Sequence, residues 1–92
     1  MADILLVESY EPLANAIRYT VEDKGHVVTI AHTLGTSLTQ IRENVFQILM
    51  VNRELGNNLE NKDGEIVAAE FKKTNPNGKI VGMSFVGVPQ WK

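Results

Sequence analysis

The chain has 92 residues, of which 43% are hydrophobic and 22% are charged, and its formal net charge is -2 at pH 7. This length allows one small domain with one core, and the mildly acidic balance disfavours a broad phosphate-binding surface, so nucleic acid is not an expected partner. There is no cysteine, no apolar run near the ~20 residues that cross a bilayer, and no basic region ahead of the opening MADILLV, so we expect a cytoplasmic protein without disulfides or membrane contact.

The first third of the chain alternates between strand and helix patterns. Ile4–Val7 is a short run of branched apolar residues, which is typical of a buried strand. Pro12–Lys24 is a predicted helix, because proline suits the first helical position and an apolar stripe follows at Leu13, Ile17 and Val21. Gly25 is expected to end this helix. Val27–Ala31 is β-branched and predicts a second strand.

The middle of the chain repeats this alternation. We expect a loop at His32–Gly35, followed by a weaker helix that Thr36 or Ser37 caps, with apolar residues at Leu38, Ile41 and Val45. Phe46–Val51 is a continuous apolar run and predicts a third strand that is buried on both faces.

A polar segment, Asn52–Asp63, is expected to form a long loop after the third strand. Asp63 can then cap a third helix that ends before Asn75 and Pro76. Lys79–Val86 predicts a fourth strand, followed by a tail to Lys92. The strand–helix alternation predicts an α/β fold: a parallel sheet between two layers of helices, in one domain over residues 1–92.

Several segments resemble the receiver domain of response regulators. The opening ILLVE followed by EPL, the polar residue that ends the third strand, the pair Leu55-Gly56, Asp63-Gly64 before the third helix and Ser84 at the end of the fourth strand occur in the order of that family. The resemblance covers nearly the whole chain. It implies a three-layer α/β/α sandwich of the flavodoxin-like (CheY-like) type with strand order 2-1-3-4, the fifth strand and last helices being absent.

The resemblance also implies a degenerate phosphorylation and metal pocket at Glu8, Ser9, Asn52, Glu54 and Ser84. In a typical receiver, two acids follow the first strand, an aspartate that accepts the phosphoryl group ends the third, a hydroxyl ends the fourth and a lysine ends the fifth. Here the acid Glu8 and the hydroxyl of Ser84 remain. Ser9 replaces the second acid, Asn52 replaces the phospho-acceptor, and the lysine has no counterpart. The amide of Asn52 is no nucleophile and cannot accept a phosphoryl group. Mg2+ prefers carboxylates, so its binding should be weak or absent unless Glu54 supplies a second carboxylate.

The resemblance therefore favours a pseudo-receiver that cannot be phosphorylated, is not an enzyme, needs no cofactor and acts in signal transduction through protein–protein contact. One alternative is a true receiver with an unusual magnesium or phosphate site. Another is a fragment excised from a larger response regulator or hybrid kinase. A small α/β enzyme is the least favoured class, because the sequence has no Gly-rich phosphate loop and no metal-ligand cluster.

The fourth strand is the expected contact surface. Without a fifth strand it lies at the edge of the sheet, and an exposed edge invites pairing with another chain. One outcome is that the tail, Phe85–Lys92, folds back over this edge. The favoured outcome is that a protein partner or a second copy, giving a dimer, covers the apolar residues of this strand and the tail: Ile80, Val81, Met83, Phe85, Val88 and Trp91.

Each pocket residue also has an ordinary structural interpretation. Glu8 can pair with Arg53 or Lys62 at the mouth of the sheet. Asn52 can satisfy backbone groups of the following loop. Ser9 can cap the first helix.

Overall fold

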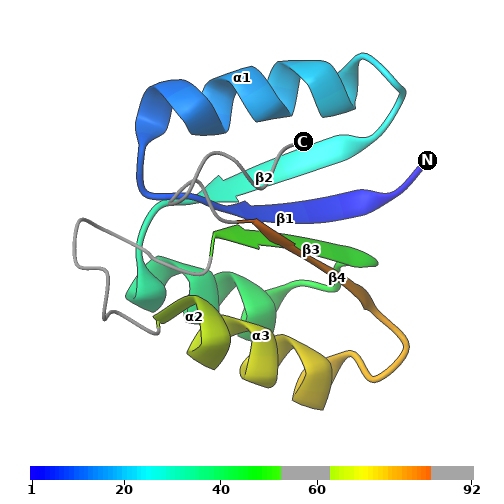
Figure 1. Cartoon of the computed structure of the whole chain (residues 1–92). Coiled ribbons are helices and arrows are strands. Elements are labelled where there is room, and N and C mark those ends of the chain that lie inside the picture. Colours follow the sequence, from blue (N-terminus) through cyan, green and yellow to red (C-terminus); the bar gives the residue numbers. More distant parts are fainter. Residues whose placement is uncertain (53–62, 84–92) are drawn as a thin grey trace.

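The computed structural model describes residues 1–52 and 63–83. Within these ranges the chain forms four strands and three helices in strict alternation (Figure 1). Their bounds are β1 Asp3–Val7, α1 Glu11–Glu22, β2 Val27–Ala31, α2 Leu34–Glu43, β3 Ile48–Asn52, α3 Asp63–Thr74 and β4 Lys79–Met83.

The strands form one parallel sheet in the order β2-β1-β3-β4. In Figure 1, α1 lies on one face of this sheet, and α2 and α3 lie side by side on the other. The α/β class and the three layers predicted from the sequence, and the strand order implied by the resemblance, are thereby confirmed. β1 and β3 are the two central strands, so their carboxyl ends meet in the middle of one edge of the sandwich.

The core lies mainly between the sheet and the α2–α3 layer. Leu5 and Val7 of β1 contribute to it together with Leu49 of β3, and Val67 and Phe71 of α3 pack onto them. Four consecutive residues of β1 are buried, as expected for a strand that is covered on both faces. This burial explains why an uninterrupted apolar run identified the strand correctly.

Several predicted boundaries are wrong. The first helix, predicted as Pro12–Lys24, runs from Glu11 to Glu22. The expected loop at His32–Gly35 is too long, because α2 begins at Leu34 with Thr33 as its N-cap. Thr33 and Thr36 form a reciprocal capping box, in which each side chain accepts a hydrogen bond from the other residue's backbone N–H. Thr36 therefore belongs to the first turn and is not the cap itself.

β3 begins at Ile48, so Phe46 lies in the segment before the strand although its side chain is buried. Val45 was assigned to the apolar stripe of the second helix, but α2 ends at Glu43 and the Val45 side chain is 73% exposed. An apolar run thus extended the predicted strand beyond the residues that are paired in the sheet.

Gly25 carries the one positive φ angle in the described ranges, at 91°. Its N–H donates to the carbonyl of Glu22 as the chain leaves α1. We predict that Gly25→Ala lowers the free energy of unfolding by about 1 kcal/mol, because a Cβ is strained in this left-handed conformation. Urea denaturation measures this loss. Gly35→Ala, in helix α2 with open space around the new methyl group, is the control and should be neutral or stabilising.

Some predicted features fall outside the described residues. The part of β4 predicted beyond Met83 and the tail residues Phe85, Val88 and Trp91 lie there, as do Glu54 and Ser84. No helix in the described ranges is long and apolar enough to cross a membrane.

Candidate functional site

The candidate site lies at the carboxyl ends of β1 and β3. Glu8 follows the last residue of β1, and Asn52 is the last residue of β3. Because the two strands are neighbours in parallel register, with Val7 beside Val51, their next residues emerge side by side. Glu8 is 2% exposed and Asn52 is 8% exposed, so both polar side chains are buried.

The two side chains are joined by a hydrogen bond. Asn52 Nδ2 donates to Glu8 Oε1 at 2.8 Å, and this bond is buried. The other carboxylate oxygen, Oε2, accepts from the backbone N–H of Tyr10 at 2.9 Å. Tyr10 is the N-cap residue of α1, so the carboxylate also lies near the positive end of that helix. A carboxylate that accepts two hydrogen bonds is stable in a buried position.

The backbone of Glu8 is also fixed. Its N–H donates to the carbonyl of Ala31 at 3.0 Å, and its own carbonyl lies 2.9 Å from Nδ1 of His32. A carbonyl only accepts, so Nδ1 of His32 carries the hydrogen and donates. His32 follows β2, and the site is thus built from the ends of three neighbouring strands.

The chemistry of this arrangement is limited. An amide is not a nucleophile for phosphoryl transfer, and the Asn52 amide is already bonded to the adjacent carboxylate. Among residues 1–52 and 63–83, no three acidic or histidine side chains are grouped so that they could hold a metal ion. The geometry favours a structural polar contact at the position where the resemblance implied a degenerate phosphorylation pocket.

The predicted site residues separate into three groups. Glu8 and Asn52 are brought together. Ser9 is half-buried and directly precedes Tyr10, which is the N-cap residue of α1. Glu54 and Ser84 lie outside the described residues, as do Arg53 and Lys62, the expected partners of Glu8.

Two contributors to the site were missed from the sequence. The backbone N–H of Tyr10 binds Glu8 because the chain turns into α1 there. Every residue except proline has such an N–H, so the residue type at this position does not predict the contact. His32 was predicted only as the first residue of the loop after the second strand. Its signal was positional, because in a parallel sheet the end of the second strand lies next to the end of the first.

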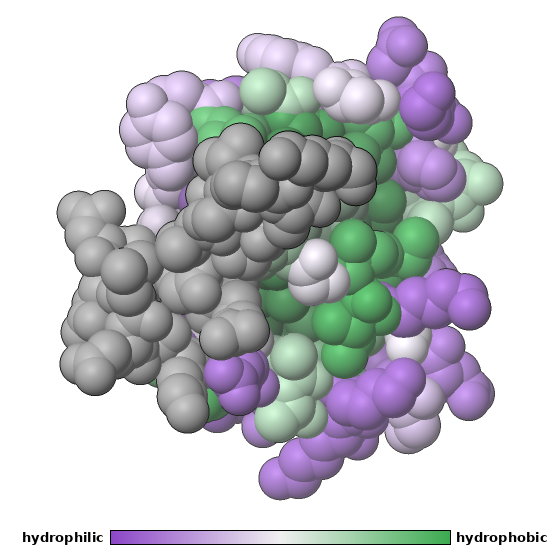
Figure 2. Space-filling model, viewed as in Figure 1, coloured by the Kyte–Doolittle hydropathy of each residue, from purple (hydrophilic) through white to green (hydrophobic). Residues whose placement is uncertain are grey.

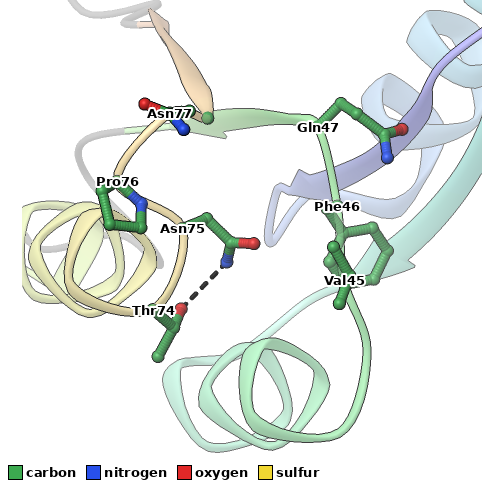
Figure 3. Close-up of a pocket in the computed structure, with 8 residues that line it drawn as sticks. Val45, Phe46, Gln47, Thr74, Asn75, Pro76 and Asn77 are labelled. Carbon is green, nitrogen blue, oxygen red and sulfur yellow. Dashed lines mark hydrogen bonds between the residues drawn. The ribbon is translucent and has the colours of Figure 1, made fainter.

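A shallow hollow of about 330 Å3 lies at the opposite, amino-terminal edge of the sheet. Figure 3 shows that the segment before β3, with Val45 and Phe46, forms one wall, and the segment before β4, with Pro76 and Asn77, forms the other. Asn75 is held there by a bond from its Nδ2 to Thr74 Oγ1 at 2.9 Å. All lining residues are uncharged, and the hollow shares no residue with the Glu8–Asn52 site.

No family model matches the sequence, and no curated protein matches it significantly. Solved structures do match. A receiver-domain protein (CheY-like) from Methanospirillum hungatei gives a TM-score of 0.80 at 21% identity, over 91% of this chain and 64% of that one. A response regulator from Burkholderia pseudomallei, solved with a phosphorylated aspartic acid, a calcium ion and citrate, gives 0.83 at 21% identity, over 95% of this chain and 49% of that one.

A third similar structure is NtrX from Brucella abortus in complex with ADP, with a TM-score of 0.77 at 24% identity over 90% of this chain. The chain has the fold of a receiver domain. It spans 17% of the NtrX chain, about half of the Burkholderia protein and under two thirds of the Methanospirillum protein. At these identities the likeness concerns the receiver fold alone.

Proposed function

We propose that this chain is a pseudo-receiver of the cytoplasm, which takes part in two-component signal transduction without being phosphorylated and acts by contact with another protein. The observation that supports this proposal most directly is the buried hydrogen bond from Asn52 to Glu8. It occurs at the strand end where the resemblance implies the phospho-acceptor, and it occupies the one acidic side chain that the resemblance retains after the first strand.

The bond argues against metal binding as well as phosphorylation. Mg2+ holds its ligands near-octahedrally at about 2.0–2.1 Å and is usually bound through carboxylates. Coordination of an ion by Glu8 would compete with the donors that already bind each of its two oxygens. We therefore propose that the chain has no resident Mg2+ and catalyses no phosphoryl transfer.

Treatment with acetyl phosphate and Mg2+ tests the proposal. We expect the intact mass of the chain to stay unchanged, and beryllofluoride with Mg2+ to leave its amide NMR spectrum unchanged. A receiver domain that is known to accept phosphate, treated in parallel, is the positive control. A mass increase of one phosphoryl group would establish the alternative, a true receiver with an unusual site.

The contact surface remains the one inferred from the sequence. Within the described ranges, β4 is one of the two edge strands of the sheet, β2 being the other, and its apolar residues Ile80 and Val81 are exposed. An apolar edge strand is a template for pairing with another chain. This supports association through β4 with a protein partner or with a second copy.

A further inference from the structure

The two histidines of the chain are held in opposite tautomers. Nδ1 of His26 accepts a hydrogen bond from the backbone N–H of Ala2 at 3.1 Å, whereas Nδ1 of His32 donates to the carbonyl of Glu8 at 2.9 Å. A backbone N–H only donates and a carbonyl only accepts, so Nδ1 is without a hydrogen in His26 and carries one in His32. The hydrogen of the neutral His26 ring is therefore on Nε2.

The bond to His26 attaches the beginning of β1 to the segment before β2. The carbonyl of Ala2 accepts from the N–H of Val27 at 2.9 Å, so both backbone groups of Ala2 bond to this segment. The regular pairing of β1 with β2 starts one residue later, at Asp3 and Val27. The His26 ring thus extends the attachment beyond the ladder. Figure 1 shows the start of the chain and the turn from α1 into β2 at the same end of the sheet.

Protonation of His26 removes this bond. The imidazolium ion carries a hydrogen on both nitrogens and has no lone pair that accepts. Two donors, Nδ1–H of His26 and N–H of Ala2, would then face each other across the distance of the present bond. Rotation of the ring restores nothing, because Nε2 is a donor as well. The N–H of Ala2 loses its acceptor in a part-buried position, where an unmade hydrogen bond is unfavourable.

The charged groups in the segments beside His26 are exposed. They are the amino group of Met1 and the side chains of Asp3, Glu22, Asp23 and Lys24. Figure 2 shows hydrophilic surface over the end of α1 and the turn that follows it. Within residues 1–52 and 63–83, the His26 ring forms no ion pair and no second hydrogen bond. The bond from Ala2 is therefore the contact that distinguishes the neutral ring from the charged ring.

We propose that His26 is a pH-sensitive attachment at the amino-terminal edge of the sheet: the neutral imidazole holds Ala2, and the imidazolium releases it. Protonation costs the folded chain a bond that the unfolded chain does not have. The stability that this bond supplies is therefore lost as the pH falls, around the pH of about 6.5 at which an imidazole in an unfolded chain takes up its proton. The inference is independent of the proposed function, because Glu8 and Asn52 lie at the opposite edge of the sheet.

Nitrogen NMR of the imidazole rings in the full chain tests the tautomers. At pH 8 we expect His26 to show an unprotonated Nδ1 and a protonated Nε2. His32 should show the reverse and serves as the reference in the same spectrum. A His26 ring with its hydrogen on Nδ1 at pH 8 could not accept from Ala2 and would overturn the proposal.

Two variants separate the loss of the acceptor from other effects of acid. His26→Asn keeps an acceptor oxygen near the position of Nδ1 and does not titrate, whereas His26→Ala has no acceptor at any pH. The amide nitrogen resonance of Ala2 is followed from pH 8 to pH 5 in carbon-detected spectra. The change seen in His26→Ala reports the neighbouring charged groups and is subtracted.

The remaining change should follow the titration of the His26 ring in the wild type and be absent in His26→Asn. A wild-type resonance of Ala2 that does not follow the ring, or a His26→Asn variant that changes as much as the wild type, would overturn the proposal.

Urea denaturation measures the effect on the fold. Relative to His26→Asn, the wild type should lose about 0.5 M in its urea midpoint between pH 8 and pH 5, which corresponds to one hydrogen bond. A midpoint difference that is equal at both pH values would show that protonation of His26 releases nothing, and the proposal would be wrong.

Discussion

Asn52→Asp is expected to lower the free energy of unfolding by about 2–3 kcal/mol at neutral pH. The change places a second carboxylate where Asn52 Nδ2 now donates to Glu8 Oε1 at 2.8 Å, in a buried contact. A favourable hydrogen bond is thereby replaced by repulsion between two acids. Two carboxyl groups at this distance cannot both be ionised without a large cost, so the folded variant retains a proton that the unfolded chain has released at pH 7.

The pH dependence of this loss has a definite sign. Where the folded state holds more protons than the unfolded state, stability falls as the pH rises. The variant should therefore approach the wild type near pH 4 and lose relative stability up to pH 7.5. Urea denaturation at both pH values measures the difference. Asn77→Asp makes the same substitution at an exposed turn position and should cost less than about 0.5 kcal/mol at either pH.

The Asn52→Asp variant also tests the proposed absence of a metal site. Two adjacent carboxylates suit a divalent cation, and a ligand that binds only the folded state stabilises it by RT ln(1 + [L]/Kd). We expect Mg2+ at ten times its Kd to restore about 1.4 kcal/mol to the variant and nothing to the wild type. Equal stabilisation of both proteins by Mg2+ would contradict the proposal, because the wild type would then hold the ion as well.

Gly78→Ala is expected to destabilise the fold by about 1–3 kcal/mol, although it adds a single methyl group. A Cβ at Gly78 would lie 2.6 Å from both Cε2 and Cζ of the Phe71 ring and 3.2 Å from the carbonyl oxygen of Asn75. Phe71 is fully buried in the core cluster, so its ring has little freedom to move aside. Guanidinium denaturation gives the magnitude, and a variant within 0.5 kcal/mol of the wild type would contradict the prediction.

A double-mutant cycle identifies the cause of this loss. Phe71→Leu shortens the side chain that the new methyl group would meet, at its own cost of lost packing. If the contact with the ring is responsible, the double variant should be more stable than the sum of the two single changes predicts, by about 1 kcal/mol. Gly35→Ala shows the effect of the same substitution where no atom lies within 4 Å.

The sequence by itself determined the elements and their arrangement. β1 and β3 were recognised because strands covered on both faces consist of uninterrupted apolar residues, and the alternation with helices implied a parallel sheet. The strand order came from the resemblance, and the structure agrees with it. The boundaries of α2 and β3 were less accurate, because a reciprocal Thr33–Thr36 cap and the buried Phe46 depend on local packing that residue types alone do not fix.

Only the tertiary structure decided the contacts of the site. Glu8 and Asn52 are 44 positions apart, and nothing in either local sequence specifies that the acid binds the amide and the Tyr10 N–H. Likewise, the apolar composition of β4 predicted a contact surface. The direction of the hydrogen bond from Lys79 to Gln47 established that the backbone groups of Ile80 and Gly82 point away from β3. Periodicity predicts which residues are buried, because burial follows the sequence one element at a time. Hydrogen-bond partners, and the residues whose backbone groups point out from an edge strand, depend on which strands become neighbours. That is settled only when the whole sheet has formed.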